Sequence, residues 1–196
     1  PGRTYAFEHI DRDTFRVLRA VGAKNEATVN DVVLAAYLRA LVEIIGPPSD
    51  VPLRLMTTVD LRRYLPQKTT GAICNLSGFT YPSFGTDPGP TFQATIKRVR
   101  DEMNRQKSDA LGLGDAFIIP LLLQPWPYAF VKKQFAWAFF DRDGRPKHKF
   151  VQPAITNIGK VDPARVIFDG TRTTNAYLTA SVIYAPGFAP AVTGFG

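Results

Sequence analysis

The segment Thr28–Ile45 (TVNDVVLAAYLRALVEII) constrains the fold of this chain more than any other. From Val32 onward, apolar residues occupy nearly every position, and only Arg39 and Glu43 interrupt them. A helix that is apolar on nearly all sides must be covered by other elements. The sequence therefore predicts a buried helix around which a folded domain packs.

Both ends of this helix carry signals of their own. Thr28 and Asp31 have the spacing of a capping box, and Asn30 is an alternative N-cap. The run Gly46-Pro47-Pro48 ends the helix, because proline cannot continue it.

The rest of the chain alternates between helical and strand-like patterns. Helices are expected from Asp11 or Asp13 to Lys24–Glu26, over Thr91–Lys107 with an Asp101–Arg105 pair, and as short proline-broken pieces within Asp115–Phe140. Strands are expected over Thr4–His9, Val51–Val59, Gly71–Tyr81, Val151–Ile158, Arg165–Phe168 and Asn175–Tyr184. Because the two kinds of element alternate without strict order, we expect an α/β fold, a mixed β-sheet flanked by helices.

Length and composition narrow the class further. With 196 residues, 45% of them hydrophobic, the chain suits a single lobe over 1–196 and is not disordered. Its longest apolar stretches are broken by prolines, so no membrane span is expected. One cysteine allows no internal disulfide, and the default location is cytoplasmic.

Catalytic material is scarce. Cys74 has no histidine near it in sequence, and neither His9 nor His148 stands in a paired or metal-binding arrangement. There is no Gly-x-Ser-x-Gly elbow and no glycine-rich phosphate loop. From its own residues the chain has no complete active site and no metal site.

The net charge of +7 is densest over residues 132–149, where aromatic residues interleave with lysines and arginines. The simpler interpretation is an amphipathic segment with aromatic residues inward and charges outward. The alternative is a surface for a phosphorylated cofactor or, less favoured, a nucleic acid.

Polar residues stand at unusual places in apolar segments: Asn30, Asp31, Asp60, Arg62, Asn75, Thr156, Asn157 and Gly159. Taken singly, they suit caps, turns and strand ends. Taken together, the segments Thr28-Val-Asn-Asp-Val-Val-Leu-Ala, Thr58-Val-Asp-Leu-Arg-Arg, Gly71-Ala-Ile-Cys-Asn and Thr156-Asn-Ile-Gly resemble the second half of the chloramphenicol acetyltransferase-like superfamily. Condensation domains, alcohol acetyltransferases and wax ester synthases belong to it, and the resemblance covers about Thr4 to Tyr184.

The resemblance implies the C-terminal lobe of a two-lobed acyltransferase. Its His-His-x-x-x-Asp-Gly motif, which supplies the general base, lies in the N-terminal lobe and is absent from this sequence. The donor implied is an acyl-CoA or a phosphopantetheine-linked thioester, and neither is a permanently bound cofactor. The Asp-Phe-Gly-Trp-Gly loop of the plant members is also absent.

By the same resemblance, Asp60 and Arg62 support the catalytic loop, with Arg62 near the aspartate of the missing motif. Asn30, Asp31, Asn75, Thr156, Asn157 and Gly159 are expected near the tunnel between the lobes. The partners implied are the N-terminal lobe and a carrier protein or coenzyme A. We expect the 196-residue chain, which looks cut at both ends, to be inactive and to expose an apolar face. The alternative is a non-catalytic module that docks a carrier protein or coenzyme A.

Overall fold

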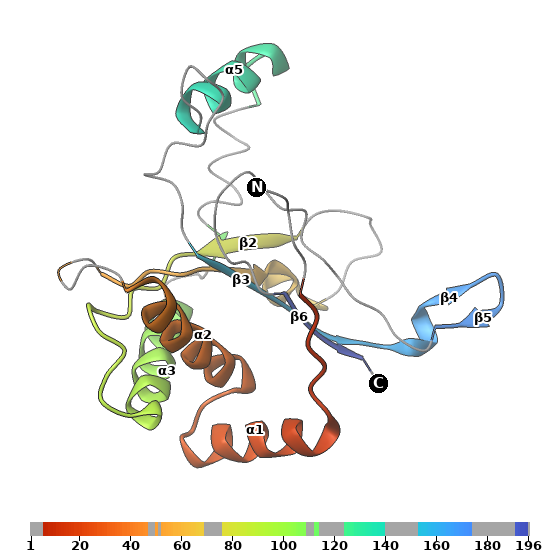
Figure 1. The fold of residues 1–196 in the computed structure, drawn as a ribbon. Helices are drawn as coiled ribbons and strands as arrows, with labels where there is room; N and C mark the ends of the chain where they lie inside the picture. Colours follow the sequence, from red (N-terminus) through yellow and green to blue (C-terminus); the bar gives the residue numbers. More distant parts are fainter. Residues whose placement is uncertain are drawn as a thin grey trace. The chain divides into compact units, whose positions relative to one another are not determined.

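The computed structural model describes residues 6–46, 50, 52–68, 76–108, 112–113, 124–139, 153–173 and 191–195 (Figure 1). The chain divides into two compact units. The first comprises Pro1–Leu55 and Tyr81–Asp109, and the second comprises Met56–Thr80 and Ala110–Gly196.

The first unit is helical. Helix α1 spans Arg12–Lys24, α2 spans Val29–Ile45, and α3 spans Phe92–Ser108. Asp11 is the N-cap of α1, and its carboxylate accepts a hydrogen bond from the backbone N–H of Thr14 at 2.7 Å. Thr28 and Asp31 form the expected capping box of α2, so Asn30 is not the cap. Gly46 ends α2 in the left-handed conformation, with φ at 57°, which favours glycine.

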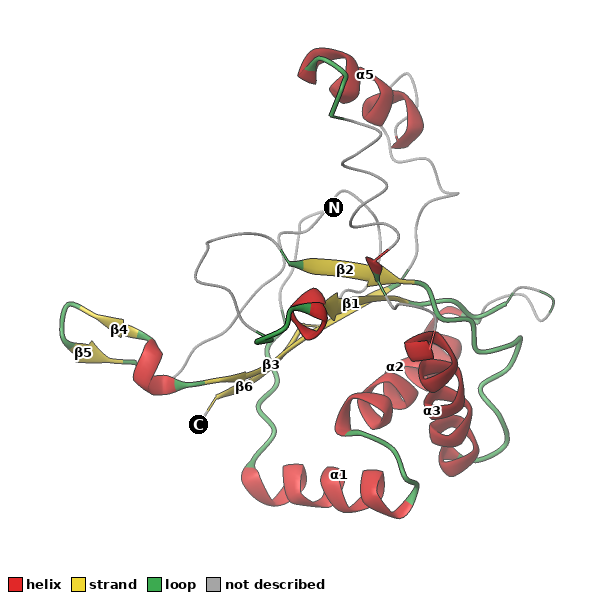
Figure 2. Ribbon diagram, turned by 180° about the vertical axis from the view of Figure 1, so that it is seen from behind, coloured by secondary structure: helices red, strands yellow, loops and turns green. Residues whose placement is uncertain are grey.

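Helix α2 packs beside α3, and the two views agree on this arrangement (Figures 1 and 2). Five apolar side chains of α2 are buried, which confirms the predicted burial for one face of the helix. The expectation of cover on nearly all sides is wrong, because Ala36, Ala40 and Ile44 lie on an exposed face. The core of this unit consists of Val32, Leu34, Ala35, Leu38, Leu41, Leu53, Leu55, Phe84, Ile96, Val99 and Met103. Each fully buried leucine or isoleucine contributes about 1.5–3 kcal/mol relative to an exposed one.

The second unit contains a four-stranded sheet in the order β2-β1-β3-β6. Its strands are β1 (Met56–Asp60), β2 (Ser77–Thr80), β3 (Ala154–Val161) and β6 (Ala191–Phe195). β1 pairs antiparallel with β2 and parallel with β3, and β3 pairs parallel with β6. The predicted α/β class with a mixed sheet is confirmed.

The other described elements of the second unit are short. They are the 3-10 helices η1 (Leu61–Tyr64) and η3 (Pro163–Arg165), the helix α5 (Tyr128–Phe139), and a hairpin of β4 (Ile167–Phe168) and β5 (Thr171–Arg172) (Figure 2). Asp169 and Gly170 form the hairpin turn with φ of 48° and 75°. Positive φ at both central residues is the geometry that fits the twist of paired strands.

Several expected elements differ from the structure. Residues 6–9 form no strand, Arg165 lies in η3 rather than in a strand, and β3 begins at Ala154 and runs to Val161. The strand expected over Val51–Val59 is regular only from Met56. Short strands are decided by the strands they pair with, which a local pattern does not contain. The strand expected over Asn175–Tyr184 lies outside the described residues.

The aromatic residues of 132–149 were expected to point inward, and for Trp137, whose side chain the structure describes, this is wrong. Trp137 is 73% exposed, and Lys132 and Lys133 are exposed with it. Residues 140–149 lie outside the described chain. None of the helices that the structure describes has the length and hydropathy needed to cross a bilayer.

Candidate functional site

The adjacent strands β1 and β3 position the first group of candidate residues. Their parallel register pairs Met56 with Ala154 and Thr57 with Ile155. Thr58 and Thr156 follow one step on, and their hydroxyl oxygens lie 2.9 Å apart in a hydrogen bond. Thr57 and Ile155 are buried, whereas Thr58 and Thr156 are half-buried. Side chains alternate between the faces of a sheet, so the threonine pair lies on the face opposite the buried one.

Asp60 lies at the end of β1 and serves as the N-cap of η1. Its Oδ1 accepts a hydrogen bond from the backbone N–H of Arg62 at 3.0 Å and another from Nη1 of Arg62 at 3.2 Å. Both side chains are exposed. The pair therefore holds the Arg62 guanidinium at the strand end, where its planar fork of N–H donors can also reach a second carboxylate.

Thr156, Asn157 and Gly159 lie along β3. Oδ1 of Asn157 accepts a hydrogen bond from the backbone N–H of Gly159 at 2.8 Å. The register against β6 shifts between these two residues, and Gly159 has φ at 76°. An L side chain is strained at that φ, so the irregularity depends on glycine. Asn157 and Gly159 thus form a local turn, as expected for each residue considered alone. The turn lies within β3, the strand that also carries Thr156.

Asn30 and Asp31 lie in the first unit, at the start of α2. Asp31 is only 2% exposed. Its Oδ2 accepts hydrogen bonds from the backbone N–H and the hydroxyl of Thr28, both at 2.8 Å. This makes Asp31 a structural residue of the helix terminus. Asn30 is half-buried one position before it.

Most of the remaining candidate residues lie outside the part of the chain that the structure describes. Asn75, Cys74 and His148 lie outside the described residues. His9 lies exposed ahead of α1. Within the described part of the chain, no group of three or more histidine, cysteine, aspartate or glutamate side chains could hold a metal ion. The one large pKa shift there is that of Tyr37, which burial raises to about 12.

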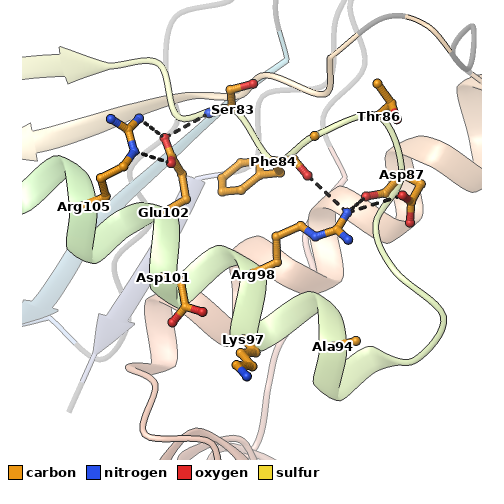
Figure 3. A pocket seen from close by; sticks show the side chains of 11 residues that line it. Ser83, Phe84, Thr86, Asp87, Ala94, Lys97, Arg98, Asp101, Glu102 and Arg105 are labelled. Atoms are coloured by element: carbon orange, nitrogen blue, oxygen red, sulfur yellow. Dashed lines mark hydrogen bonds and ion pairs between the residues drawn. The ribbon is translucent and has the colours of Figure 1, made fainter.

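A groove of about 770 Å³ in the first unit was not found from the sequence. It runs between α3 and residues 83–87 (Figure 3). Nη1 of Arg98 donates to the carbonyl oxygens of Phe84 and Asp87. Glu102 accepts hydrogen bonds from Arg105 and from the backbone N–H of Ser83. These bonds tie the groove walls together and pair the charges of Arg98, Glu102 and Arg105, and Lys97 lines the same groove as an exposed side chain.

The same contacts correct the expected Asp101–Arg105 pair. Arg105 pairs with Glu102 at 2.8 Å, and Asp101 pairs with Arg100 at 2.8 Å. Glu102 also accepts from Gln106, so it gathers donors from its own helix and from Ser83. These donors, Arg105 first among them, lower the pKa of Glu102. The helical spacing of charged residues 97–105 was the signal in the sequence for this charged face.

No family model and no curated protein sequence matches this chain. Among solved structures it is similar to the polyketide synthase associated protein 5 from Mycobacterium tuberculosis. The TM-score is 0.53 at 17% sequence identity, with 93% of this chain and 42% of that protein covered. The chain shares this fold.

A second solved structure, the first condensation domain of the CDA synthetase, has a TM-score of 0.45 at 13% identity. The match covers 72% of this chain and 26% of that one. The chain therefore spans less than half the length of either protein. At these identities the likeness concerns the fold and not the reaction.

Proposed function

We propose that this chain is the C-terminal lobe of an acyltransferase of the chloramphenicol acetyltransferase-like superfamily. The reaction is transfer of an acyl group from a thioester, on coenzyme A or a carrier protein, to an alcohol or an amine. Two findings support the proposal. The fold likeness extends over 93% of this chain but 42% of the polyketide synthase associated protein. Two of the four resembling segments also lie on neighbouring strands of one sheet.

The observation that carries the proposal is the set of polar groups on β1 and β3. The Thr58–Thr156 hydroxyl bond joins the Val-Asp-Leu-Arg segment to the Thr-Asn-Ile-Gly segment, which lie 98 residues apart in sequence. Asp60 and Arg62 then follow on β1 and η1. The resemblance expects the first segment beside the catalytic loop and the second beside the tunnel between the lobes, and their direct contact in the fold is consistent with that expectation.

In this proposal the chain positions groups and does not move the proton. The general base is a histidine of the His-His-x-x-x-Asp-Gly motif in the other lobe. An imidazole titrates near neutral pH and can take the proton of the acceptor hydroxyl or amine as that group attacks the thioester carbonyl. Arg62, already oriented by Asp60, would pair with the aspartate of that motif and hold its loop.

The test is acyl transfer by the purified chain and by the protein that carries both lobes. Each is given an acyl-CoA and a simple alcohol or amine, and release of free thiol is measured. The two-lobed protein should release thiol in an acceptor-dependent manner, and the 196-residue chain should not. Transfer by this chain alone would contradict the assignment of the base to the other lobe.

The alternative function is a non-catalytic module that docks a carrier protein or coenzyme A. The presence of an intact His-His-x-x-x-Asp-Gly motif in the full-length coding sequence favours the enzyme, and its loss favours the docking module. A two-lobed protein that binds an acyl-CoA without releasing thiol would support the docking module.

A further inference from the structure

Helix α5 is apolar in sequence but exposed in the structure. Pro127 precedes it, and the carbonyl oxygen of Pro127 accepts hydrogen bonds from the backbone N–H groups of Phe130 and Val131. Among the described helices and strands, none makes an extensive contact with α5. An apolar helix whose large side chains are exposed is a candidate interaction surface.

One side of this segment carries a regular stripe of aromatic residues and a lysine. Trp126, Phe130, Lys133 and Trp137 recur at i, i+4, i+7 and i+11, the spacing that keeps residues on one side of a helix. We call these four residues the α5 stripe. The rings of Trp126 and Phe130 are stacked, with centroids 4.7 Å apart. Lys133 and Trp137 line a shallow hollow of about 280 Å³ with Gln134.

The large side chains of the α5 stripe meet solvent. Trp126 is 53% exposed, Phe130 41% and Trp137 73%. Tyr128 and Lys132 are exposed as well. The α5 stripe therefore combines two tryptophan rings, each with a polar N–H, and one phenylalanine ring with a lysine whose long stem can lie along an apolar layer.

The charge of the segment indicates the partner. Between residues 116 and 140 the only charged side chains are Lys132 and Lys133, and there is no aspartate or glutamate. Tryptophan and tyrosine collect at the headgroup level of a bilayer, and lysine is attracted to anionic lipids. A nucleic acid would call for a longer series of cations, whereas the stripe has one lysine among three aromatic rings.

We propose that α5 binds the surface of an anionic lipid membrane, lying in the plane of the interface with the three rings of the α5 stripe toward the acyl chains and the ammonium of Lys133 at the headgroups. This inference is independent of the proposed acyl transfer, because it rests on the exposure and charge of α5 alone. It describes a peripheral contact of one helix and no crossing of the bilayer.

The chain has only two tryptophans, and both belong to the α5 stripe. Intrinsic tryptophan emission of the 196-residue chain therefore reports on this surface alone. We expect the emission to shift to the blue when vesicles with roughly 30 mol % phosphatidylglycerol are added, and to shift little with phosphatidylcholine alone. Co-sedimentation with the same vesicles measures the affinity.

Three variants test the role of each feature. Replacing both lysines, as Lys132→Gln with Lys133→Gln, should weaken binding to the anionic vesicles about 30-fold, because each lysine near such a surface contributes about fivefold. Trp137→Ala should also weaken binding, while Trp126 still reports. Phe168→Ala is the matched control, since Phe168 is 71% exposed on the β4–β5 hairpin, and it should bind as the unchanged chain does.

Four outcomes would overturn the proposal. The first is emission that does not respond to vesicles, and the second is an equal response to neutral and anionic ones. The third is a blue shift that depends on protein concentration without lipid, which would indicate self-association. The fourth is an equal response to an oligonucleotide, which would indicate a nucleic-acid surface. Circular dichroism of each variant shows whether the fold is retained; because the altered side chains are exposed, we expect no loss.

Discussion

The hydroxyl groups of Thr58 and Thr156 bond at 2.9 Å across the parallel strands β1 and β3. This contact joins two segments that are 98 residues apart in sequence. It lies on the half-buried side of strands whose other faces bury Thr57 and Ile155. A polar bond at this place fixes the register of the two strands from which Asp60 and Asn157 emerge.

The bond between these threonines should appear as a coupling energy. In a double-mutant cycle, Thr58→Val and Thr156→Val should each lower the free energy of unfolding by about 1 kcal/mol, because each leaves the other hydroxyl without its partner. The double variant should then differ from the sum of the single variants by about 0.5–1.5 kcal/mol. Urea denaturation measures all four proteins. Strict additivity would show that the bond contributes nothing.

Asp31 should contribute more to the free energy of unfolding than an exposed acidic residue at the start of a helix does. Asp31→Ala removes two hydrogen bonds to Thr28 at a buried cap, and we expect a loss of about 1–2 kcal/mol. Asp13→Ala in the first turn of α1 is the control, because its pair with Arg16 is exposed, and it should cost less than about 0.5 kcal/mol. Thermal denaturation compares the two, and equal losses would argue against the capping box.

Glu102 should make stability depend on acid pH. Hydrogen bonds from Arg105, Gln106 and the backbone of Ser83 lower its pKa below the ordinary value of 4.5. As the pH falls, the unfolded chain therefore takes up the proton first, and the stabilisation is lost through the folded-state pKa. The difference in unfolding free energy between the unchanged chain and Glu102→Gln should be fully present above pH 4.5 and shrink below it. Urea titrations across this range measure it; a difference independent of pH would contradict the effect.

Arg62 should affect acyl transfer if the proposed function holds. In the two-lobed protein, Arg62→Lys keeps the charge but loses the planar fork that can serve Asp60 and a second carboxylate together. Misplacement of a catalytic loop lowers kcat by up to about 100-fold, with a smaller effect on KM. Arg63→Lys is the control, because the Arg63 guanidinium lies over the ring of Tyr64 at 5.5 Å. Thiol release measures both variants, and equal rates would remove Arg62 from the site.

The helices of the first unit could be predicted because their signals are local. The Thr28–Asp31 capping box and the apolar run after Val32 lie within one helix, so the sequence alone locates α2. The Asp101–Arg105 pair was wrong because spacing does not decide between neighbours three and four residues away. Arg105 pairs with Glu102, which also accepts from the backbone of Ser83, and that contact depends on the fold.

In the candidate site, too, the features set by local sequence were predictable and those set by strand pairing were not. That Asp60 leaves a strand is a local fact, and the sequence indicated it. Asn157 and Gly159 were expected to end a strand, but they form an irregularity within β3, because pairing with β6 continues to Val161. That Thr58 meets Thr156 depends on the parallel pairing of β1 with β3, which no local pattern contains. The strand β6 was not predicted from the sequence for the same reason, because it is recognised by its pairing with β3.

A side chain at position 78 on β2 should destabilise the chain. A Cβ placed there would lie 2.4 Å from the carbonyl oxygen of Gly112 and 3.0 Å from Leu61. The backbone of residue 112 must therefore move, at a cost of about 1–3 kcal/mol, so Gly78→Ala should lower the free energy of unfolding by that amount. Urea denaturation of the purified chain measures it.

Comparison with Gly170→Ala separates the steric loss of stability at Gly78 from a loss that comes from backbone conformation alone. Gly170 has φ at 75° and nothing within 4 Å of an added Cβ, so its replacement costs only the left-handed strain, about 1–2 kcal/mol. A second substitution near Gly112 distinguishes the two causes, because it should reduce only the steric loss. A Cβ added at residue 78 would clash with the backbone of Gly112. Leu113, the next residue, packs against Val59 and Leu61. Leu113→Ala should therefore loosen this place and reduce the further loss caused by Gly78→Ala. The same change should leave the loss caused by Gly170→Ala as it was. If Leu113→Ala adds equally to both, the close approach of β2 to residue 112 does not set the cost at Gly78.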